Sequence, residues 1–418
     1  MRFGINTLDD LDVRGKTVLC RVDINQPLDR AAGTLKDTTR IEACTPTLKE
    51  LSAQGAKVVL LAHQGSDIEY QNFYTTAPHA QVLSHLLGKP VGFIDDVCGP
   101  AARAAIQALK PGELLLLDNV RFVAEEQTLF EMKLQLSPAA QAKTLLVQKL
   151  APLADLYVCD AFAAAHRDQP SLCGFEQILP SAMGRLFEEE FCVISGLMEQ
   201  PKRPCIFVLG GAKISDAFLM MRTVLKGGIA DTVLTGGLVG EVLLWADGKD
   251  IGEEARSFIK KEGYESLVGT ARELLAQYRD RILMPEDFAA VHGGKRVEYP
   301  LGKIPGDTLI LDIGTKTGVC YQAQIRAAKT VFVNGPMGVF EDAPTEQGTR
   351  MVWDALGDTG AYTVIGGGDS ITATKKYGKT KDINYICTGG GALIRFLTGE
   401  ELPVVKALRY GSKLTQKQ

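Results

Sequence analysis

The chain has 418 residues, of which 45% are hydrophobic and 23% charged, so it is long enough for two globular domains of roughly 200 residues each. Its formal net charge of −4 offers no electrostatic basis for binding nucleic acid or an anionic membrane, so any basic site must be local. No run approaches the ~18 apolar residues of a membrane-spanning helix, and the first residues lack the apolar stretch of a signal peptide. We therefore expect a cytoplasmic protein with no nucleic-acid or membrane partner.

Nine cysteines are scattered along the chain without any CxxC pair, and several of them lie inside apolar runs. They are Cys20, Cys44, Cys98, Cys159, Cys173, Cys192, Cys205, Cys320 and Cys387. This distribution favours buried free thiols in a reducing compartment over disulfides or a metal site.

Short apolar runs alternate with longer amphipathic segments through most of the chain, which is the pattern of a strand, a crossover helix and a second strand. The runs are apolar on both faces, as parallel strands covered by helices should be. In the first half we expect strands at residues 17–20, 57–62, 113–117 and 155–158. In the second half we expect them at residues 205–209, 232–234, 307–311, 330–333, 362–365 and 385–387. The pattern predicts an α/β fold with two doubly wound parallel sheets.

The boundary between the two sheets is predicted within residues 180–204. Ser181 is a candidate helix N-cap, and the segment from it to Glu199 carries apolar residues at helical spacing. Pro201 and Pro204 then interrupt the pattern. The sequence thus predicts one helix joining two lobes, and because no low-complexity linker intervenes, we expect the lobes to move as a hinge.

Glycines follow several predicted strands of the second half. The motifs are Gly210-Gly211-Ala212-Lys213, Asn334-Gly335-Pro336, Gly366-Gly367-Gly368-Asp369 and Thr388-Gly389-Gly390-Gly391. Ligands of open parallel sheets sit beyond the carboxyl ends of the strands, where glycines let backbone N–H groups approach an anion closely. One glycine pair would fit a tight turn equally well, but four such motifs favour a nucleotide phosphate chain. Asp369 is a hard oxygen ligand suited to Mg²⁺ on that nucleotide.

Two other nucleotide motifs are not matched. The nearest approach to a P-loop is residues 373–380, which lack its first glycine, so we interpret them as a polar loop. The glycines of residues 236–240 do not form a G-x-G-x-x-G pattern, so hydride transfer with a dinucleotide is weakly supported.

Charged and polar residues occur at the strand ends of the first half. Four residues are candidate cationic donors, three of them at predicted strand ends: Arg40, His63, Arg121 and Arg167. Asp23 and Asn25 lie among them and are candidates to bind a hydroxyl group. An isolated Arg near a strand end is most often part of a surface ion pair. Several together are better explained by a small phosphorylated or carboxylated ligand, because Arg offers bidentate donors. No His/Asp/Ser arrangement suggests a hydrolase.

These motifs together resemble those of the phosphoglycerate kinase family, most closely its archaeal branch. The likeness runs from the first expected strand to the last and covers nearly the whole chain. It is carried by residues 21–25 with Pro27, 62–65, 119–122, 160–167, 209–213, 312–317, 334–341, 366–369 and 388–392. The most specific part is Asn-Gly-Pro-Met-Gly-Val-Phe-Glu at residues 334–341, together with the two glycine triplets.

The resemblance implies two Rossmann-like lobes joined by a long helix and hinge. The implied bounds are 1–184 with a returning tail, 404–418, for a phosphoglycerate-binding lobe, 185–200 for the helix and 201–403 for a nucleotide-binding lobe. It implies reversible phosphoryl transfer between ATP and the carboxylate of 3-phosphoglycerate, giving 1,3-bisphosphoglycerate and ADP with Mg²⁺, in glycolysis and gluconeogenesis. A monomer is expected, with a homodimer as the alternative.

The resemblance also implies roles for individual residues. Those expected to bind phosphoglycerate are Asp23, Asn25, Arg40, His63, Gln64, Gly65, Ser66, Arg121 and Arg167. Those expected to hold the nucleotide are Gly211, Lys213, Asn334, Glu341 at the ribose, Gly367, Gly368, Ser370 and the metal ligand Asp369. Those expected to stabilise the transferred phosphoryl group are Arg40, Lys213, Gly368 and Gly391. Because the acceptor carboxylate is already ionised at neutral pH, no general base is expected.

Some residues depart from the common pattern of that family. Residues 63–67 read His-Gln-Gly-Ser-Asp where His-Leu-Gly-Arg-Pro is common, so Ser66 replaces an expected phosphate-binding Arg. Gln169 stands where many members have a second His, and Ala217 where many have a second Lys. Two alternatives therefore stay open: a kinase for a different phosphorylated carboxylic acid, and a binding or scaffold protein that kept the nucleotide site.

Overall fold

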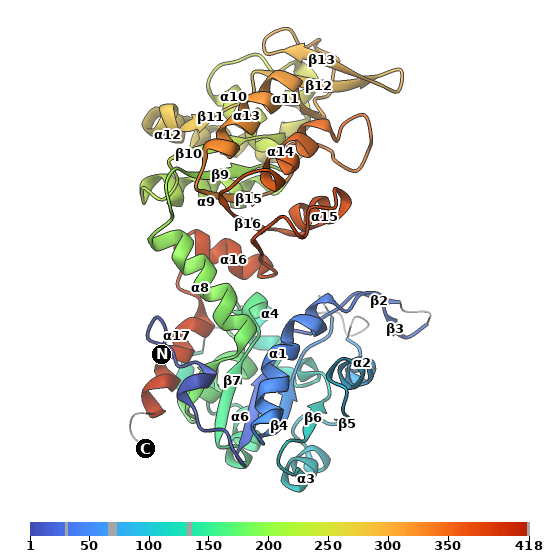
Figure 1. The fold of residues 1–418 in the computed structure, drawn as a ribbon, viewed down its shortest axis with the longest axis vertical. Coiled ribbons are helices and arrows are strands. Elements are labelled where there is room, and N and C mark those ends of the chain that lie inside the picture. Colours follow the sequence, from blue (N-terminus) through green and yellow to red (C-terminus); the bar gives the residue numbers. More distant parts are fainter. Residues whose placement is uncertain (30–31, 66–72, 132–135, 416–418) are drawn as a thin grey trace. The chain divides into compact units, whose positions relative to one another are not determined.

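The computed structural model describes residues 1–29, 32–65, 73–131 and 136–415. It divides into two compact units, which are coloured along the chain in Figure 1. The first unit comprises Met1–Cys192 with Glu401–Gln418, and the second comprises Val193–Glu400. Each unit has its own six-stranded sheet in which every neighbouring pair of strands is parallel. The predicted α/β class with two doubly wound parallel sheets is confirmed.

The sheet of the first unit has the strand order β5-β6-β4-β1-β7-β8. Its strands are β1 (Thr17–Arg21), β4 (Lys57–Leu61), β5 (Val91–Ile94), β6 (Leu114–Leu117), β7 (Leu156–Cys159) and β8 (Ser181–Met183). The four central strands were predicted, because they are apolar on both faces. The two edge strands were not, and β5 shows why: it is only partly buried and contains Gly92. A separate short hairpin joins β2 (Leu28–Asp29) to β3 (Thr34–Leu35).

The prediction that Ser181 caps the long helix is wrong. Ser181 begins β8 and pairs with Tyr157 of β7, and the helix α8 (Arg185–Glu199) starts only at Arg185. The Ser181 hydroxyl donates to the carbonyl of Leu179 at 2.7 Å, so it caps no helix. A serine after a proline suits a strand start as well as a helix start, and tertiary pairing decides here.

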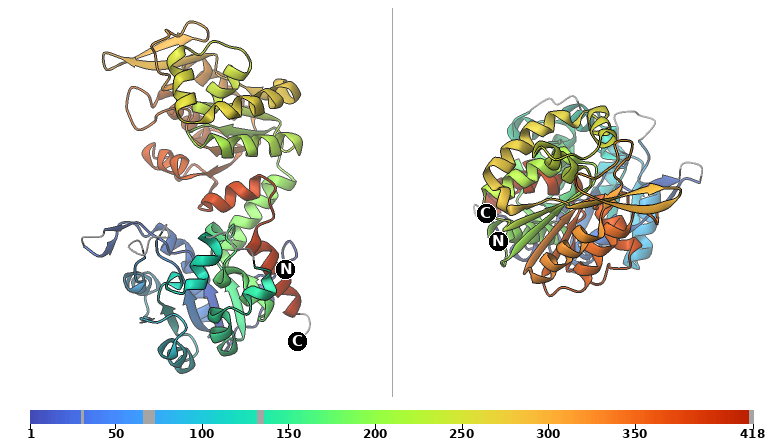
Figure 2. Two further views of the ribbon diagram at one scale, coloured as in Figure 1. Left: turned by 180° about the vertical axis from the view of Figure 1, so that it is seen from behind. Right: turned by 90° about the horizontal axis from the view of Figure 1, so that it is seen from above.

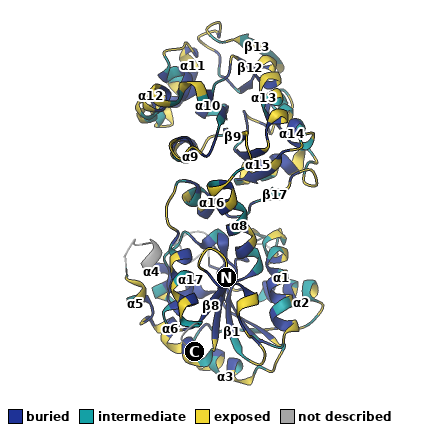
Figure 3. Ribbon diagram, turned by 60° about the vertical axis from the view of Figure 1, so that its left-hand side comes forward, coloured by how far each residue is buried: buried dark blue, intermediate teal, exposed yellow. Residues whose placement is uncertain are grey.

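Helices cover both faces of the first sheet. They are α1 (Thr39–Ala53), α2 (Ala77–Leu87), α3 (Pro100–Ala108), α4 (Ala124–Glu131), α5 (Pro138–Gln141), α6 (Leu145–Leu150), α7 (Pro170–Cys173) and α17 (Pro403–Leu414). In α1, Ile41, Leu48 and Leu51 recur at helical spacing and pack into the core with alternate residues of the strands. In Figure 3 the strands of this sheet are dark blue, because helices exclude water from both of their faces.

The C-terminal helix α17 belongs to the first unit, far in sequence from the strands that it covers. It packs against β8 and the 3₁₀ turn Phe175–Gln177. The Ser412 hydroxyl accepts a hydrogen bond from the backbone N–H of Asn6 at 2.8 Å, so both ends of the chain are tied into one unit (Figure 2). Gly411 permits this close contact, since a Cβ there would lie 2.5 Å from the Ser181 hydroxyl oxygen.

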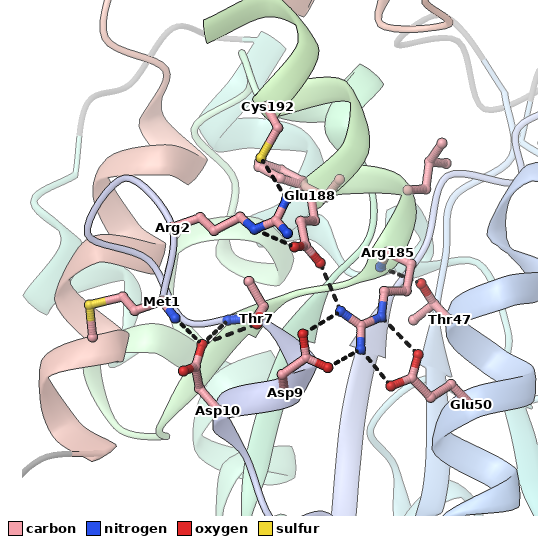
Figure 4. Close-up of polar contacts among 12 residues, drawn as sticks. Met1, Arg2, Thr7, Asp9, Asp10, Thr47, Glu50, Arg185, Glu188 and Cys192 are labelled. Atoms are coloured by element: carbon pink, nitrogen blue, oxygen red, sulfur yellow. Dashed lines mark hydrogen bonds and ion pairs between the residues drawn. The ribbon is translucent and has the colours of Figure 1, made fainter. Parts of the chain in front are cut away.

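A network of ion pairs centred on Arg185 stabilises the first turn of α8 (Figure 4). The Arg185 guanidinium contacts carboxylates of Asp9 at 2.6 Å, Glu50 at 2.7 Å and Glu188 at 2.9 Å. Glu188 also pairs with Arg2 at 3.2 Å. These carboxylates raise the pKa of Arg185, so its charge persists. The start of α8 is thereby fastened to α1 and to the N-terminal segment of the same unit.

The main sheet of the second unit has the strand order β11-β10-β9-β15-β16-β17. Its strands are β9 (Cys205–Leu209), β10 (Thr232–Thr235), β11 (Ile282–Leu283), β15 (Thr330–Asn334), β16 (Tyr362–Gly366) and β17 (Tyr385–Ile386). All but β11 were predicted. A second, antiparallel sheet contains β12 (Asp287–His292), β13 (Lys295–Pro300) and β14 (Asp312–Ile313), of which β12 and β13 form a hairpin (Figure 1).

The strand predicted at residues 307–311 is wrong. These residues are irregular, and β14 begins after them. They are apolar because Leu309, Ile310 and Leu311 line a cavity rather than a sheet. An apolar run alone does not distinguish the two situations.

Helices also cover the second sheet. They are α9 (Ile214–Lys226), α10 (Gly237–Ala246), α11 (Glu253–Lys261), α12 (Leu267–Tyr278), α13 (Thr315–Ala327), α14 (Gln347–Gly357), α15 (Gly368–Lys376) and α16 (Gly390–Leu397). Trp353 of α14 and Tyr321 of α13 pack on one face with Val208 and Val333 of the central strands.

The nine cysteines are free thiols, six of them buried, as the sequence predicted. Among the described residues, no helix is both long enough and apolar enough to cross a membrane.

A buried acid in the first unit makes its stability pH-dependent. Glu176 is fully buried beside α17, and no other described residue bonds to either of its carboxylate oxygens. Burial therefore raises its pKa well above the usual value of 4.5. Because the folded chain keeps this proton where the unfolded chain loses it, stability falls as pH rises above about 4.5, by up to about 1.4 kcal/mol per pH unit.

We expect Glu176→Gln, which cannot ionise, to gain stability relative to the natural chain as pH rises from 5 to 8. Thermal unfolding at several pH values measures this difference. The exposed Glu189→Gln serves as the control and should leave the pH dependence unchanged. Parallel curves for the natural chain and Glu176→Gln would contradict the assignment.

Candidate nucleotide and anion sites

The glycine-rich loops meet at the carboxyl edge of the second sheet, where the neighbouring strands β10, β9, β15 and β16 end. The N–H of Gly211 donates to the carbonyl of Pro336 at 2.8 Å, and the N–H of Gly237 donates to that of Met337 at 2.8 Å. A Cβ on Gly210 would lie 2.1 Å from the Pro336 carbonyl oxygen. Only glycine allows backbone to pack on backbone this closely.

Several of these loops lead directly into the N-terminus of a helix. The helices α9, α10, α15 and α16 each begin within a few residues of a strand end. Their first N–H groups lack partners within the helix and, with the helix dipole, favour an anion. Lys213 immediately precedes α9 and is exposed, Gly368 and Asp369 open α15, and Gly391 lies in the first turn of α16. The arrangement suits a phosphate chain.

A cavity of about 280 Å³ lies beside these loops within the second unit. Of the residues predicted for the nucleotide, Gly211, Glu341 and Asp369 line it. The rest of its wall is mainly apolar, with Leu238, Phe258, Phe288, Ile310, Met337, Val339 and Phe340. A polar end and an apolar body match the shape of a nucleotide, with phosphates at one end and a flat base at the other.

The other predicted nucleotide residues do not line this cavity. Ser370 is buried, and its hydroxyl accepts a hydrogen bond from the N–H of Gly335 at 2.7 Å, so it holds the loop after β15. Gly367 has φ +89°, and a Cβ on it would lie 2.4 Å from Oδ1 of Asn334. Asn334, Gly367 and Ser370 therefore shape the loops around the site. Lys213 and Gly368 are exposed outside the cavity wall.

Two residues of this site were not predicted from the sequence. Lys376 donates to the carbonyls of Phe340 at 2.6 Å and Glu341 at 3.0 Å, which fixes the loop carrying Glu341. Glu241 of α10 lines the cavity and is only 3% exposed. Burial raises its pKa to about 8. A lone Glu or Lys within a helix gives no sequence signal for either role.

The polar loops of the first unit meet at the corresponding edge of its sheet. Asn25 follows β1 and Gly65 follows β4, and the two exchange hydrogen bonds of 3.3 Å and 3.0 Å. Arg121, which follows β6, donates to the Gly65 carbonyl at 2.6 Å. The Gln64 side chain bonds to the backbone of Gln26 at 3.0 Å and 2.7 Å, so it supports the loop instead of extending from it.

Guanidinium groups converge around His63, which is only 3% exposed. Arg21 donates to its Nδ1 at 3.1 Å, which leaves the proton of the neutral ring on Nε2. The pKa of His63 lies well below 6.5, first because of burial and then because of the positive charges of Arg21, Arg121, Arg167 and Arg40. The predicted cations Arg40, Arg121 and Arg167 are therefore gathered at one place with His63, as a small anion requires.

Two further side chains complete this cluster. Arg40 pairs with Asp23 at 2.5 Å, so the predicted acid and cation contact each other directly. Arg21 was not among the residues predicted to bind the ligand, although it belongs to the motif at residues 21–25. It is fully buried and also donates a hydrogen bond to the Ser171 hydroxyl at 3.0 Å. Ser66, expected in place of the common Arg, lies outside the described residues.

Comparison with known proteins agrees with this geometry. The family model described as phosphoglycerate kinase matches residues 8–400. The chain belongs to the phosphoglycerate kinase family. It is accordingly an enzyme, a kinase of the glycolytic phosphoglycerate kinase type.

The relatives cover nearly the whole chain. The phosphoglycerate kinase of Methanothermobacter thermautotrophicus is 45% identical over 406 residues, 97% of each chain. That of Thermococcus kodakarensis is 41% identical over 406 residues, 96% of each chain. Both are archaeal, so the predicted branch is confirmed.

Solved structures of the family share the fold. The crystal structure of the Pyrococcus horikoshii phosphoglycerate kinase superposes with a TM-score of 0.86 at 41% identity, covering 98% of this chain and 100% of that one. The Coxiella burnetii structure gives a TM-score of 0.82 at 28% identity, covering 97% and 98%.

The donor set around Asp369 fits a nucleotide-bound Mg²⁺. Among the described residues, no group of three or more His, Cys, Asp or Glu is gathered into a metal cage. Asp369 is an exposed carboxylate in the first turn of α15, and it lines the cavity beside the glycine-rich loops. Mg²⁺ in nucleotide sites is usually held by one or two carboxylates, with phosphates and water completing its shell.

We expect Gly367→Ala to weaken Mg-ADP binding and to destabilise the second unit by about 1–3 kcal/mol, because Ala at positive φ is strained and would displace Asn334. Calorimetry and thermal unfolding measure the two effects. Gly360→Ala is the matched control, since its Cβ would meet nothing within 4 Å. Unchanged affinity in Gly367→Ala would show that this backbone conformation is not needed for the nucleotide.

Proposed function

We propose that the chain catalyses reversible phosphoryl transfer between ATP and the carboxylate of 3-phosphoglycerate, giving 1,3-bisphosphoglycerate and ADP, in glycolysis and gluconeogenesis. The observation that carries this proposal is the pairing of two sites in one kinase-family chain. The second unit has a glycine-walled cavity beside helix N-termini, and the first has guanidinium groups converging on His63. A cytoplasmic monomer remains our expectation.

In the first unit, the arginines bind the acid substrate. Arg40, Arg121 and Arg167 supply charge-assisted hydrogen bonds to its phosphate and carboxylate groups. Asp23 and Asn25 bind its hydroxyl, and Nε2 of neutral His63 is a further donor. Because Arg21 already occupies Nδ1 at 3.1 Å, that donor is fixed in orientation.

In the second unit, the loops hold the nucleotide. The N–H groups around Gly211, Gly368 and Gly391 bind phosphate oxygens, and Glu341 binds the ribose. Asp369 would hold Mg²⁺, and the metal ion would supply positive charge that offsets the negative charge of the phosphates. Lys213, ahead of α9, follows the phosphoryl group during transfer.

The chemistry needs no general base. The attacking carboxylate is ionised at neutral pH, and phosphoryl transfer is accelerated mainly by positioning and by charge stabilisation. The residues proposed to act on the transferred phosphoryl group are accordingly cations and backbone N–H groups, and none of them is a general base.

Two other functions compete with this proposal. A kinase for another phosphorylated carboxylic acid is motivated by Ser66, and a scaffold would need only the fold. The retained Lys213, Asp369 and Glu341 argue against the scaffold. A coupled assay with 3-phosphoglycerate and ATP separates the proposed reaction from both alternatives, because only the proposed reaction gives turnover.

In that assay we expect Lys213→Ala to lower kcat on the order of a hundredfold with little change in KM, because the ammonium acts mainly on the migrating phosphoryl group. Lys226→Ala, at the opposite end of α9, is the control and should behave as the natural chain does. An effect confined to KM would remove Lys213 from this role.

We expect the two units to close during turnover. The acid and the nucleotide are bound by different units, and their reacting atoms must come within ~3–3.5 Å with water excluded. Small-angle scattering should give a smaller radius of gyration with both ligands than with either alone. An unchanged radius in a turning-over sample would refute ligand-driven closure.

A further inference from the structure

Glu241 is an unusual residue in the wall of the nucleotide cavity. It lies on α10, is 3% exposed and lines the cavity among mainly apolar side chains such as Phe258 and Phe288. No described residue forms a hydrogen bond or ion pair with its carboxyl group. A buried polar group without a partner is costly, and native proteins usually satisfy such groups. A ligand in the cavity can provide the missing partner.

Burial is the sole cause of the raised pKa of Glu241, which is about 8. The elements packed around it, α9, α11 and α12, contribute no charge that shifts this value. The other carboxyl groups of the cavity wall are Asp312, Glu341 and Asp369, and Asp312 is paired with Arg296 at 2.8 Å. Glu241 is thus neutral at pH 7 and becomes ionised in mildly alkaline solution.

We propose that Glu241 is a specificity-determining residue whose carboxyl group pairs with the edge of the nucleotide base. The neutral acid accepts adenine and guanine nucleotides alike, and the carboxylate favours guanine nucleotides. The proposal rests on the nucleotide site described under the proposed function. Asp369 and Gly211 line the cavity next to the helix N-termini that suit phosphates, and Glu241 lines the same cavity one turn into α10, with Phe258 and Phe288 also in its wall. The apolar part of such a wall is where a flat base would be buried.

The selectivity follows from counting donors and acceptors. A neutral carboxylic acid has one O–H donor and one carbonyl acceptor. Adenine offers an amino donor next to a ring nitrogen acceptor, and guanine offers a ring N–H donor next to a carbonyl acceptor, so both edges are complementary. A carboxylate has acceptors only. Guanine, with its ring N–H beside its amino group, presents two adjacent donors to it, whereas adenine does not.

The test compares the natural chain with Glu241→Gln and Glu241→Leu. Calorimetry measures Mg-ADP and Mg-GDP affinity from pH 6.5 to 8.5, without the acid substrate, a range in which guanine keeps its ring N–H. For the natural chain we expect similar affinities at pH 6.5 and a GDP preference that rises severalfold, towards about tenfold, by pH 8.5. Glu241→Gln keeps one donor and one acceptor, so its preference should not change with pH. Glu241→Leu should bind both nucleotides about tenfold more weakly.

Several results would overturn this inference. A GDP-to-ADP ratio that is flat with pH in the natural chain would do so, as would a rising ratio that persists in Glu241→Gln. Tighter binding of both nucleotides by Glu241→Leu would show that the cavity requires no polar partner for the base. The exposed Glu254→Gln is the control for the substitution itself.

The outcome is distinguishable from failure of the proposed function. Turnover of 3-phosphoglycerate and ATP by the natural chain at pH 7 tests the reaction without reference to base preference. If turnover occurs and the nucleotide ratio does not depend on Glu241, only the present inference falls. If nucleotides bind as expected but no turnover occurs, the acid substrate is the part that was misassigned.

Discussion

Contact between the backbones of two loops is the constraint on which the nucleotide site depends. The loops after β9 and β15 touch where a Cβ on Gly335 would lie 2.1 Å from the Gly210 carbonyl oxygen. Side chains at these points would separate the loops and the helix N-termini that follow them. The N–H groups proposed to bind phosphate are therefore positioned by main-chain packing, and the Ser370 hydroxyl supports this packing by accepting a hydrogen bond from Gly335. This gives a preorganised site that needs few charged side chains.

The first unit differs from this, because its site contains several positively charged side chains that repel one another. Arg21 is fully buried and is held by Ser171, whose hydroxyl in turn bonds to the buried carboxyl of Glu126. Arg40 is held by Asp23. His63 relieves the repulsion by remaining neutral, so it adds a donor without adding charge. Under the proposed function, one unit would bind its ligand mainly with backbone dipoles and the other mainly with side-chain charge, so the two ligands would meet chemically distinct environments.

Much of this could be predicted from sequence, for identifiable reasons. Central strands such as β9 are apolar on both faces, and glycine motifs at their ends are informative since few other residues permit such contacts. Predictions failed where tertiary context overrides a local pattern. Ser181 is part of strand β8 because it pairs with β7. The run at residues 307–311 is apolar because three of its residues line a cavity. Arg21 and Glu241 gave no distinctive signal, since burial next to a site is visible only after folding.

Two acids illustrate why burial by itself does not identify function. Glu176 and Glu241 are both buried, and for both burial raises the pKa of the carboxyl group. Glu176 faces α17, where a Cβ on Gly411 would lie 3.1 Å from the Cβ of Glu176, and we expect the cost of burying its carboxyl group to lower stability. Glu241 borders a cavity, so a bound molecule can supply the partner that the protein lacks. An unpartnered polar group is therefore a functional signal when open space adjoins it, because only there can binding recover the free energy lost on folding.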